Sequence, residues 1–340
     1  MSAAENPGFE TGSVSVDSLI DENEVHFANL RQLTFGGENA EAYFSPDDRQ
    51  LIFQSTPRDA SCDQQYIMNI DGSGLRMVST GEGRTTCGYF IPGADRILYS
   101  STHLAGEACP APPDRSQGYV WAIYPGYDIF EADLDGGDLK RITSTEGYDA
   151  EATLSRDGKW IVFTSTRDGD LDIYKMRPDG SEVTRLTDEV GYDGGPFFSY
   201  DGTKIVYRAS HPESDEEIAD YQRLLAQNMI RPSQLDLWVM DADGSNKTRL
   251  TDNEAANFGP YFFPNGQRVI FSSNMDDPTG REFDLYAIDV TGENLERITY
   301  TGDFDGFPMF NSDGSQLVFA SNRGNELPHE TNLFIVDWVE

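Results

Sequence analysis

A short pattern recurs six times along this chain of 340 residues, and it constrains the fold more than any other feature. Its fullest form, Gly191–Tyr207, reads as a loop, a short aromatic strand, an Asp-Gly turn and a β-rich strand. The equivalent turn positions are Asp48, Ala94, Gly158, Gly202, Gly266 and Gly314, with spacings of 46, 64, 44, 64 and 48 residues. Periods of about 40–50 residues with several strands each are typical of blades arranged in a ring.

Two further strand signals complete each repeat. A third strand rich in β-branched and aromatic residues follows, as at Asp172–Met176, and a fourth ends in Leu-Thr or Ile-Thr, as at Leu186–Thr187. The last repeat stops after its third strand, Asn332–Trp338, whereas an extra fourth strand, Asn29–Phe35, precedes the first repeat. We therefore predict an all-β, six-bladed β-propeller of four-stranded antiparallel blades, in which the N-terminal strand completes the last blade and leaves no open edge.

The domain organisation follows from where the pattern begins. Residues 1–25 are polar and aperiodic and are expected to form a flexible N-terminal arm, and residues 26–340 the propeller. Two long repeats carry insertions at about 102–127 in blade 2 and 211–234 in blade 4. Ser214–Glu217 in the second has the form of a capping box before a helical apolar pattern, which predicts one short helix, either covering the propeller or acting as a lid beside its channel.

Charge limits the class of partner. The chain has 25 Lys and Arg against 59 Asp and Glu, a formal net charge of −34. Such a surface repels nucleic acid and anionic lipid and suits cationic ligands or metal ions. No apolar run is long enough to span a membrane, and Met1–Gly8 has no signal-peptide pattern. We expect no nucleic-acid binding, no membrane insertion and a monomer.

One repeat position, nine residues before each turn, is always small and polar. Its members are Asn39, Thr85, Asp149, Asp193, Asn257 and Asp305. Each is expected where the chain enters the innermost strand, at the rim of the central channel on the face that also carries the insertions. Neighbouring candidates for ligand binding are Glu41 and Glu151 two residues further on, and Arg84, Tyr148, Tyr192 and Phe304 one residue before. An alternative is that the Asp and Asn side chains only cap their own loops.

The rim contains two candidate sets of metal ligands. Converging carboxylates of Asp149, Asp193 and Asp305 suit Ca²⁺ or another divalent cation on the channel axis. His103 and His211 occupy the same slot after the second strand of blades 2 and 4, and they form a second candidate ligand pair.

Three cysteines, Cys62, Cys87 and Cys109, leave at least one thiol unpaired in a monomer. All three are expected on the loop side of adjacent blades 1 and 2, so one disulfide is geometrically feasible. Cys62–Cys109 is the preferred pair, and three reduced thiols in a cytoplasmic protein are the alternative.

The units Leu186–Thr187, Asp201–Gly202 and Arg167–Tyr174 resemble the TolB-like, or WD40-like (PD40), propeller repeat over residues 26–338, without the N-terminal α/β domain of TolB. The resemblance implies that the slot of His103 and His211 commonly holds an arginine tied to an acidic residue. It also implies a periplasmic or extracellular protein of the bacterial cell envelope that binds a protein, peptide or small ligand at the loop face. The alternatives are a metal-dependent lyase or hydrolase acting on an oligosaccharide or peptide there, and a purely structural module.

Overall fold

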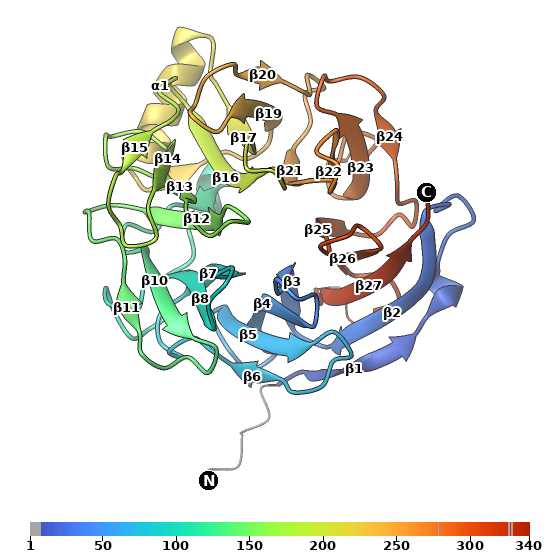
Figure 1. The fold of residues 1–340 in the computed structure, drawn as a ribbon. Coiled ribbons are helices and arrows are strands. Elements are labelled where there is room, and N and C mark those ends of the chain that lie inside the picture. The colour runs from blue at the N-terminus through green and yellow to red at the C-terminus, as the bar shows by residue number, and fades with distance from the viewer. Residues whose placement is uncertain (1–7, 278, 326, 328) are drawn as a thin grey trace.

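The protein, described from a computed structural model covering residues 8–277, 279–325, 327 and 329–340, is a ring of six antiparallel sheets around a central axis (Figure 1). The predicted six-bladed β-propeller is therefore confirmed. Each blade begins with its innermost strand and runs outward, so the blade order follows the chain. Among the described residues, no helix is long and apolar enough to cross a membrane.

The first three blades are regular. Blade 1 comprises β3 (Glu38–Phe44), β4 (Gln50–Thr56), β5 (Gln64–Asn69) and β6 (Arg76–Met77). Blade 2 comprises β7 (Thr85–Phe90), β8 (Arg96–Ser101), β10 (Asp128–Asp133) and β11 (Lys140–Arg141). Blade 3 comprises β12 (Asp149–Leu154), β13 (Ile161–Ser165), β14 (Asp172–Met176) and β15 (Thr184–Arg185).

The last three blades include the closure. Blade 4 comprises β16 (Tyr192–Phe198), β17 (Lys204–Ser210), β19 (Asp236–Asp241) and β20 (Thr248–Arg249). Blade 5 comprises β21 (Asn257–Phe262), β22 (Arg268–Ser273), β23 (Asp284–Asp289) and β24 (Glu296–Arg297). Blade 6 comprises β25 (Asp305–Phe310), β26 (Gln316–Ser321) and β27 (Asn332–Trp338), completed by β2 (Phe27–Phe35). The register of β2 on β27 pairs Phe27 with Trp338 and Arg31 with Ile335, which confirms the predicted seal.

The expected flexible arm is wrong for residues 8–25, while residues 1–7 lie outside the described residues. β1 (Glu10–Ser15) pairs with β2 as a fifth strand of blade 6, and a short 3-10 helix, η1 (Asp17–Leu19), follows it. Phe9 is buried against the rings of Tyr66 and Phe53 of blade 1, at 5.3 and 6.2 Å between centroids. This anchor explains the order, and the mostly exposed faces of β1 explain why its sequence lacks apolar alternation.

Both insertions are ordered and they meet. The blade 2 insertion contains η2 (Arg115–Gln117) and β9 (Trp121–Ala122), and β9 pairs with β18 (Met229–Ile230) of the blade 4 insertion. The predicted helix is α1 (Asp215–Leu225), with the capping box between Ser214 and Glu217 in place. We call this assembly of β9, β18 and α1 the cap. Its apolar side chains pack on blade 3 residues such as Tyr148 and Leu171, so the cap covers that blade.

Candidate functional site

The six predicted rim residues do not face the channel. Asn39, Thr85, Asp149, Asp193, Asn257 and Asp305 are each at most 1% exposed. The amide of Asn39 donates to the carbonyls of Gly36 and Thr331, and that of Asn257 to Leu235. The hydroxyl of Thr85 donates to the Asp63 carbonyl. These side chains therefore bind the loops of the blades, as in the capping alternative.

The three acidic members of this ring form ion pairs within their own blades. Asp149 accepts from Arg167 at 2.9 Å, and Asp305 from Arg323 at 2.8 Å. Asp193 lies 3.0 Å from Nε2 of His211. The cation comes each time from the slot after the second strand, the arrangement that the TolB-like resemblance implies.

These ion pairs leave no converging carboxylates at the rim. Asp149, Asp193 and Asp305 each turn into their own blade. Within the described residues, no group of three or more His, Cys, Asp or Glu side chains is placed to hold a metal ion. The donor set expected for a cation on the channel axis is thus not assembled by these residues.

The two slot histidines differ from each other. Burial disfavours the charged form of His211, but its hydrogen bond to Asp193 and the charges of Asp193 and Glu189 outweigh burial and raise its pKa. His103 bonds to the Ser101 hydroxyl at 2.9 Å, and its pKa is lowered, chiefly by burial. His103 and His211 therefore act within separate blades and do not form a shared site.

The side chains two residues further on do reach the channel. Each innermost strand has a register shift at this position, and the bulged residue has a left-handed backbone. The φ values are +52° for Glu41, +51° for Cys87, +56° for Glu151, +58° for Gly195, +58° for Gly259 and +55° for Phe307. A bulge with a positive φ redirects the side chain, and bulges are common beside binding sites. We call these six positions the bulge ring.

Glu41 and Cys87 are close enough to residues of neighbouring blades for their charges to interact. Burial raises the pKa of Glu41 to about 7, and the charge of Glu151 of blade 3 raises it further, whereas a hydrogen bond from Cys87 and the charge of Arg208 of blade 4 oppose the increase. Burial likewise raises the pKa of the Cys87 thiol, and the negative charges of Glu41 and Glu151 raise it further. Residues of four successive blades therefore interact around one space.

Glu151 and Arg208 form the best-satisfied part of this space. Arg208 donates to Glu151 at 2.5 Å and to the hydroxyl of Tyr192 at 2.9 Å. Glu151 also accepts from Thr164 and from the backbone N–H of Gly195. The guanidinium of Arg208 lies 5.3 Å from the Trp121 ring, so the cap reaches the channel mouth.

Aromatic side chains close the channel below the bulge ring. Tyr43 lies 5.5 Å from Tyr89 and 5.7 Å from Phe197, and Phe197 lies 5.5 Å from Tyr261, centroid to centroid. These residues stand two positions after the bulge in blades 1, 2, 4 and 5.

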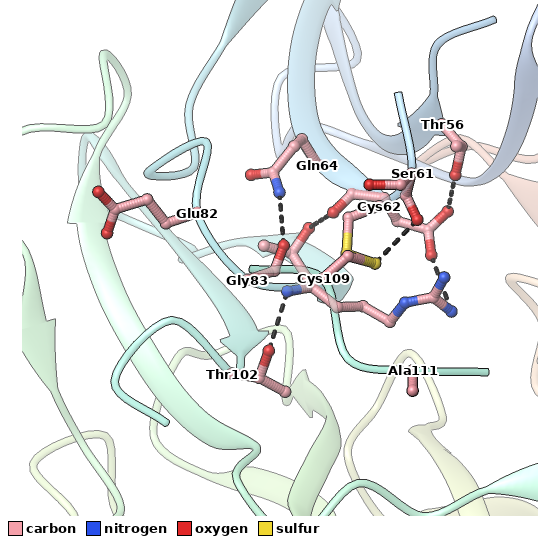
Figure 2. Close-up of a disulfide and its surroundings, with 12 residues drawn as sticks. Thr56, Ser61, Cys62, Gln64, Glu82, Gly83, Thr102, Cys109 and Ala111 are labelled. Carbon is pink, nitrogen blue, oxygen red and sulfur yellow. Dashed lines mark hydrogen bonds and ion pairs between the residues drawn. A yellow bond between two sulfur atoms is a disulfide. The ribbon is translucent and has the colours of Figure 1, made fainter. Parts of the chain in front are cut away.

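A disulfide fixes the other side of the mouth. Cys62 of the β4–β5 loop is bonded to Cys109 of the blade 2 insertion, the pair expected from the sequence, and Cys87 is free (Figure 2). Close to the disulfide, Arg84 pairs with Asp63 at 3.4 Å, and its backbone N–H donates to Thr102. The disulfide thus ties the insertion to the blade 1 loop beside Arg84.

The cap leaves a separate pocket on the same face, with a volume of ≈ 390 Å³. Blade 3 loops contribute Gly147, Tyr148 and Thr166, the blade 2 insertion Ile123 and Pro125, and the α1 region Gln222, Leu225, Ala226 and Asn228. None of its lining residues carries a formal charge, in a chain of net charge −34. Of the sequence candidates, only Tyr148 contributes. The rest of the pocket depends on the two insertions meeting, which no local pattern indicates.

The protein is a six-bladed β-propeller with its insertions and its disulfide on one face. The model of the TolB beta propeller domain (PD40) matches residues 113–230, so this part of the chain is similar to TolB-type repeats. The resemblance inferred from the repeats is thereby confirmed. No curated protein matches the chain.

Solved structures with the same fold include proteins whose names indicate different functions. A putative TolB from Agrobacterium tumefaciens is 18% identical, with 98% of both chains covered and a TM-score of 0.58. A gluconolactonase from Xanthomonas campestris is 13% identical, with 97% of this chain and 95% of that chain covered and a TM-score of 0.58. An oligogalacturonate lyase in complex with manganese is 13% identical, with 97% of both chains covered and a TM-score of 0.54. At these identities the likeness establishes the fold alone.

Proposed function

We propose that this chain is a non-enzymatic binding propeller of the bacterial cell envelope, which holds a peptide segment of a partner protein on its loop face. The observation that carries the proposal is the pocket between the cap and blade 3. Its volume falls in the range of ligand sites, and uncharged walls with a few amide and hydroxyl groups suit an uncharged stretch of peptide. A rigid scaffold that presents loops on one face is a common basis for such binding.

The Cys62–Cys109 disulfide supports a periplasmic or extracellular location, because disulfides persist in oxidising compartments. The resemblance to TolB propellers also supports a cell-envelope role. The alternative is a lyase or hydrolase acting on an oligosaccharide, suggested only by neighbours of about 13% identity. No activated nucleophile lines the pocket, so binding is the simpler proposal.

Two matched variants test the pocket. Ala226 lines it, whereas Ala219 is an exposed alanine of the same helix that does not. Peptides selected from a random display library against the wild-type protein should lose binding to Ala226→Trp, in which an indole fills the pocket, and should keep it with Ala219→Trp.

Equal binding to both variants, or no selected binder, contradicts the proposal. The same protein should be incubated with oligogalacturonate and Mn²⁺ while absorbance of unsaturated products is followed. Turnover in this assay would establish the enzymatic alternative instead.

A further inference from the structure

A second pocket lies on the face of the ring opposite the insertions. It has a volume of ≈ 170 Å³, and the turns between the first and second strands of their blades supply Pro46, Asp48, Pro92, Arg156 and Ser312. The innermost strands of blades 1, 2, 3, 5 and 6 supply its aromatic wall and two aliphatic side chains. Because five of the six blades contribute, the pocket lies at the axis of the ring, and we call it the turn-face pocket.

The walls of the turn-face pocket are largely apolar. Phe44, Phe90, Leu154 and Phe310 line it and are each at most 5% exposed. An apolar cavity of about 150 Å³ accommodates a molecule of the size of benzene. The turn-face pocket is slightly larger than that, so its walls suit a ligand with one small aromatic ring.

Among the described residues that line this pocket, Arg156 is the only cation, and no carboxylate pairs with it. Its guanidinium lies 4.1 Å from the centroid of the Tyr200 ring and donates to the carbonyl of Ser312 at 3.5 Å. Tyr200 is fixed in turn, because its hydroxyl donates to the Asn311 carbonyl at 2.9 Å. A guanidinium has five N–H donors in a planar fork, and stacking on a ring leaves the edge of that fork accessible. Arg156 therefore presents unused donors at the pocket.

The carboxylate of Asp48, which also lines the pocket, already has its own partners. It accepts from the backbone N–H of Ser312 at 2.9 Å and from the Ser312 hydroxyl. These bonds offset a left-handed backbone at Asp48, with φ of +59°, at a turn position that is glycine in four other blades. Asp48 thus joins the turns of blades 1 and 6 and does not neutralise Arg156.

We propose that the turn-face pocket binds a small aromatic monocarboxylate, with its ring between the apolar walls and its carboxylate accepting hydrogen bonds from Arg156. Hydrogen bonds from arginine to a carboxylate are charge-assisted and can be bidentate, so they orient the ligand. A mostly apolar pocket with one charged group is typical of small-molecule sites. Because the site lies on the face opposite the cap, the inference goes beyond the proposed function and does not depend on it.

The test compares three ligands on the wild-type protein. Benzoate and benzamide have nearly the same shape, but benzamide is neutral, whereas acetate keeps the carboxylate and lacks the ring. In titration calorimetry at pH 8, benzoate should bind at least tenfold more tightly than benzamide and than acetate. Equal binding of benzoate and benzamide, equal binding of benzoate and acetate, or no binding of benzoate would each overturn the inference.

A matched pair of variants then locates the carboxylate. Arg156→Gln should lose at least tenfold in affinity for benzoate. Arg115→Gln removes an exposed arginine from the blade 2 insertion on the opposite face and should leave this affinity unchanged. If the two variants bind benzoate equally, Arg156 does not hold the carboxylate and the inference fails.

The cap pocket provides a further control. Ala226→Trp fills that pocket and should bind benzoate as the wild type does. A loss of benzoate binding in this variant would place the ligand in the cap pocket and overturn the inference. Failure of the turn-face pocket and failure of the proposed function therefore give different results.

Discussion

Two rings of residues, two positions apart in every repeat, have opposite roles. The outer one, exemplified by Asp149 and Asp305, is buried and joined to cations of its own blade. The inner one, exemplified by Glu41 and Glu151, lies at a left-handed bulge and faces the channel. The same chemical group thus pairs within its own blade at one position and interacts with residues of neighbouring blades at the other.

The composition of the outer ring already reflects its structural role. It is acidic only in blades 3, 4 and 6, where the slot holds Arg167, His211 and Arg323. Where the slot holds Pro57, His103 or Met275, the ring residue is uncharged. If these carboxylates served a channel ligand, their presence would not depend on the residue in the slot after the second strand. We therefore infer that this ring stabilises the blades.

The largest expected effect is in the outer ring. Arg323 is 1% exposed and bonds to Glu24 of the N-terminal segment as well as to Asp305. Arg323→Ala leaves two buried carboxylates without their cation, and we expect a loss of about 3–5 kcal/mol in the free energy of unfolding, measured by urea denaturation. Arg49→Ala, at an 83% exposed side chain, is the control and should change stability by less than about 0.5 kcal/mol. A loss below about 1 kcal/mol for Arg323→Ala would mean that the triad is not structural.

The repeat pattern of the sequence predicts some features of the two rings and not others. The spacing of the repeats predicted the positions of both rings, the third strands, the turns and the N-terminal closure, because the same local pattern occurs in each repeat. The sequence did not predict the direction in which the side chains point. That direction depends on a backbone bulge, and a glutamate such as Glu41 or Glu151 does not indicate a bulge. The signal available was Gly195 and Gly259, two glycines at the equivalent position, which favour a positive φ.

The cap and the N-terminal segment were beyond local patterns. β9 and β18 pair with each other over two residues each, and they belong to different insertions. β1 is mostly exposed, so only the buried ring of Phe9 marks it. Both depend on single long-range contacts, which a repeat analysis cannot detect.

The second effect, in the inner ring, has the opposite sign. The folded pKa of Glu41 is about 7, above its ordinary value of 4.5, so the folded protein retains a proton that the unfolded chain releases. This group therefore costs no stability below pH 4.5, and the cost grows as the pH rises and levels off above pH 7. Glu41→Gln should stabilise the protein by about 1–3 kcal/mol at pH 8 and by close to nothing at pH 4.

Thermal unfolding of wild type and Glu41→Gln across this pH range measures that difference. Cys87, Glu151, Asp63 and Arg208 also face Glu41, so the reference is the difference between the two proteins and not the wild-type curve alone. Destabilisation at pH 8 would show that Glu41 is structural, like the outer ring.

The third effect concerns the one ion pair of the outer ring that depends on pH. The pKa of His211 is raised, so the stability from its positive charge is present below pH 6.5 and is lost as the pH rises through the folded pKa. Burial also raises the pKa of Asp193, so the pair weakens again at low pH once Asp193 takes up a proton. His211→Arg gives blade 4 the permanent cation of blades 3 and 6. We expect about 1 kcal/mol of added stability at pH 8.5 and little change at pH 5.5, measured by thermal unfolding. A gain that is equal at both pH values would exclude titration of His211 as its cause.

The smallest effect is a rate at Cys87, the free thiol of the inner ring. Burial and the charges of Glu41 and Glu151 raise its pKa, so little thiolate is present at pH 8. Glu41→Gln removes the nearest of these charges, and alkylation of Cys87 by iodoacetamide should become a few-fold faster, followed by mass spectrometry. Asp193→Asn removes a buried charge from the outer ring and should leave the rate unchanged, because that carboxylate faces its blade. If Asp193→Asn accelerates alkylation as much as Glu41→Gln, the two rings are not electrostatically separate and the comparison fails.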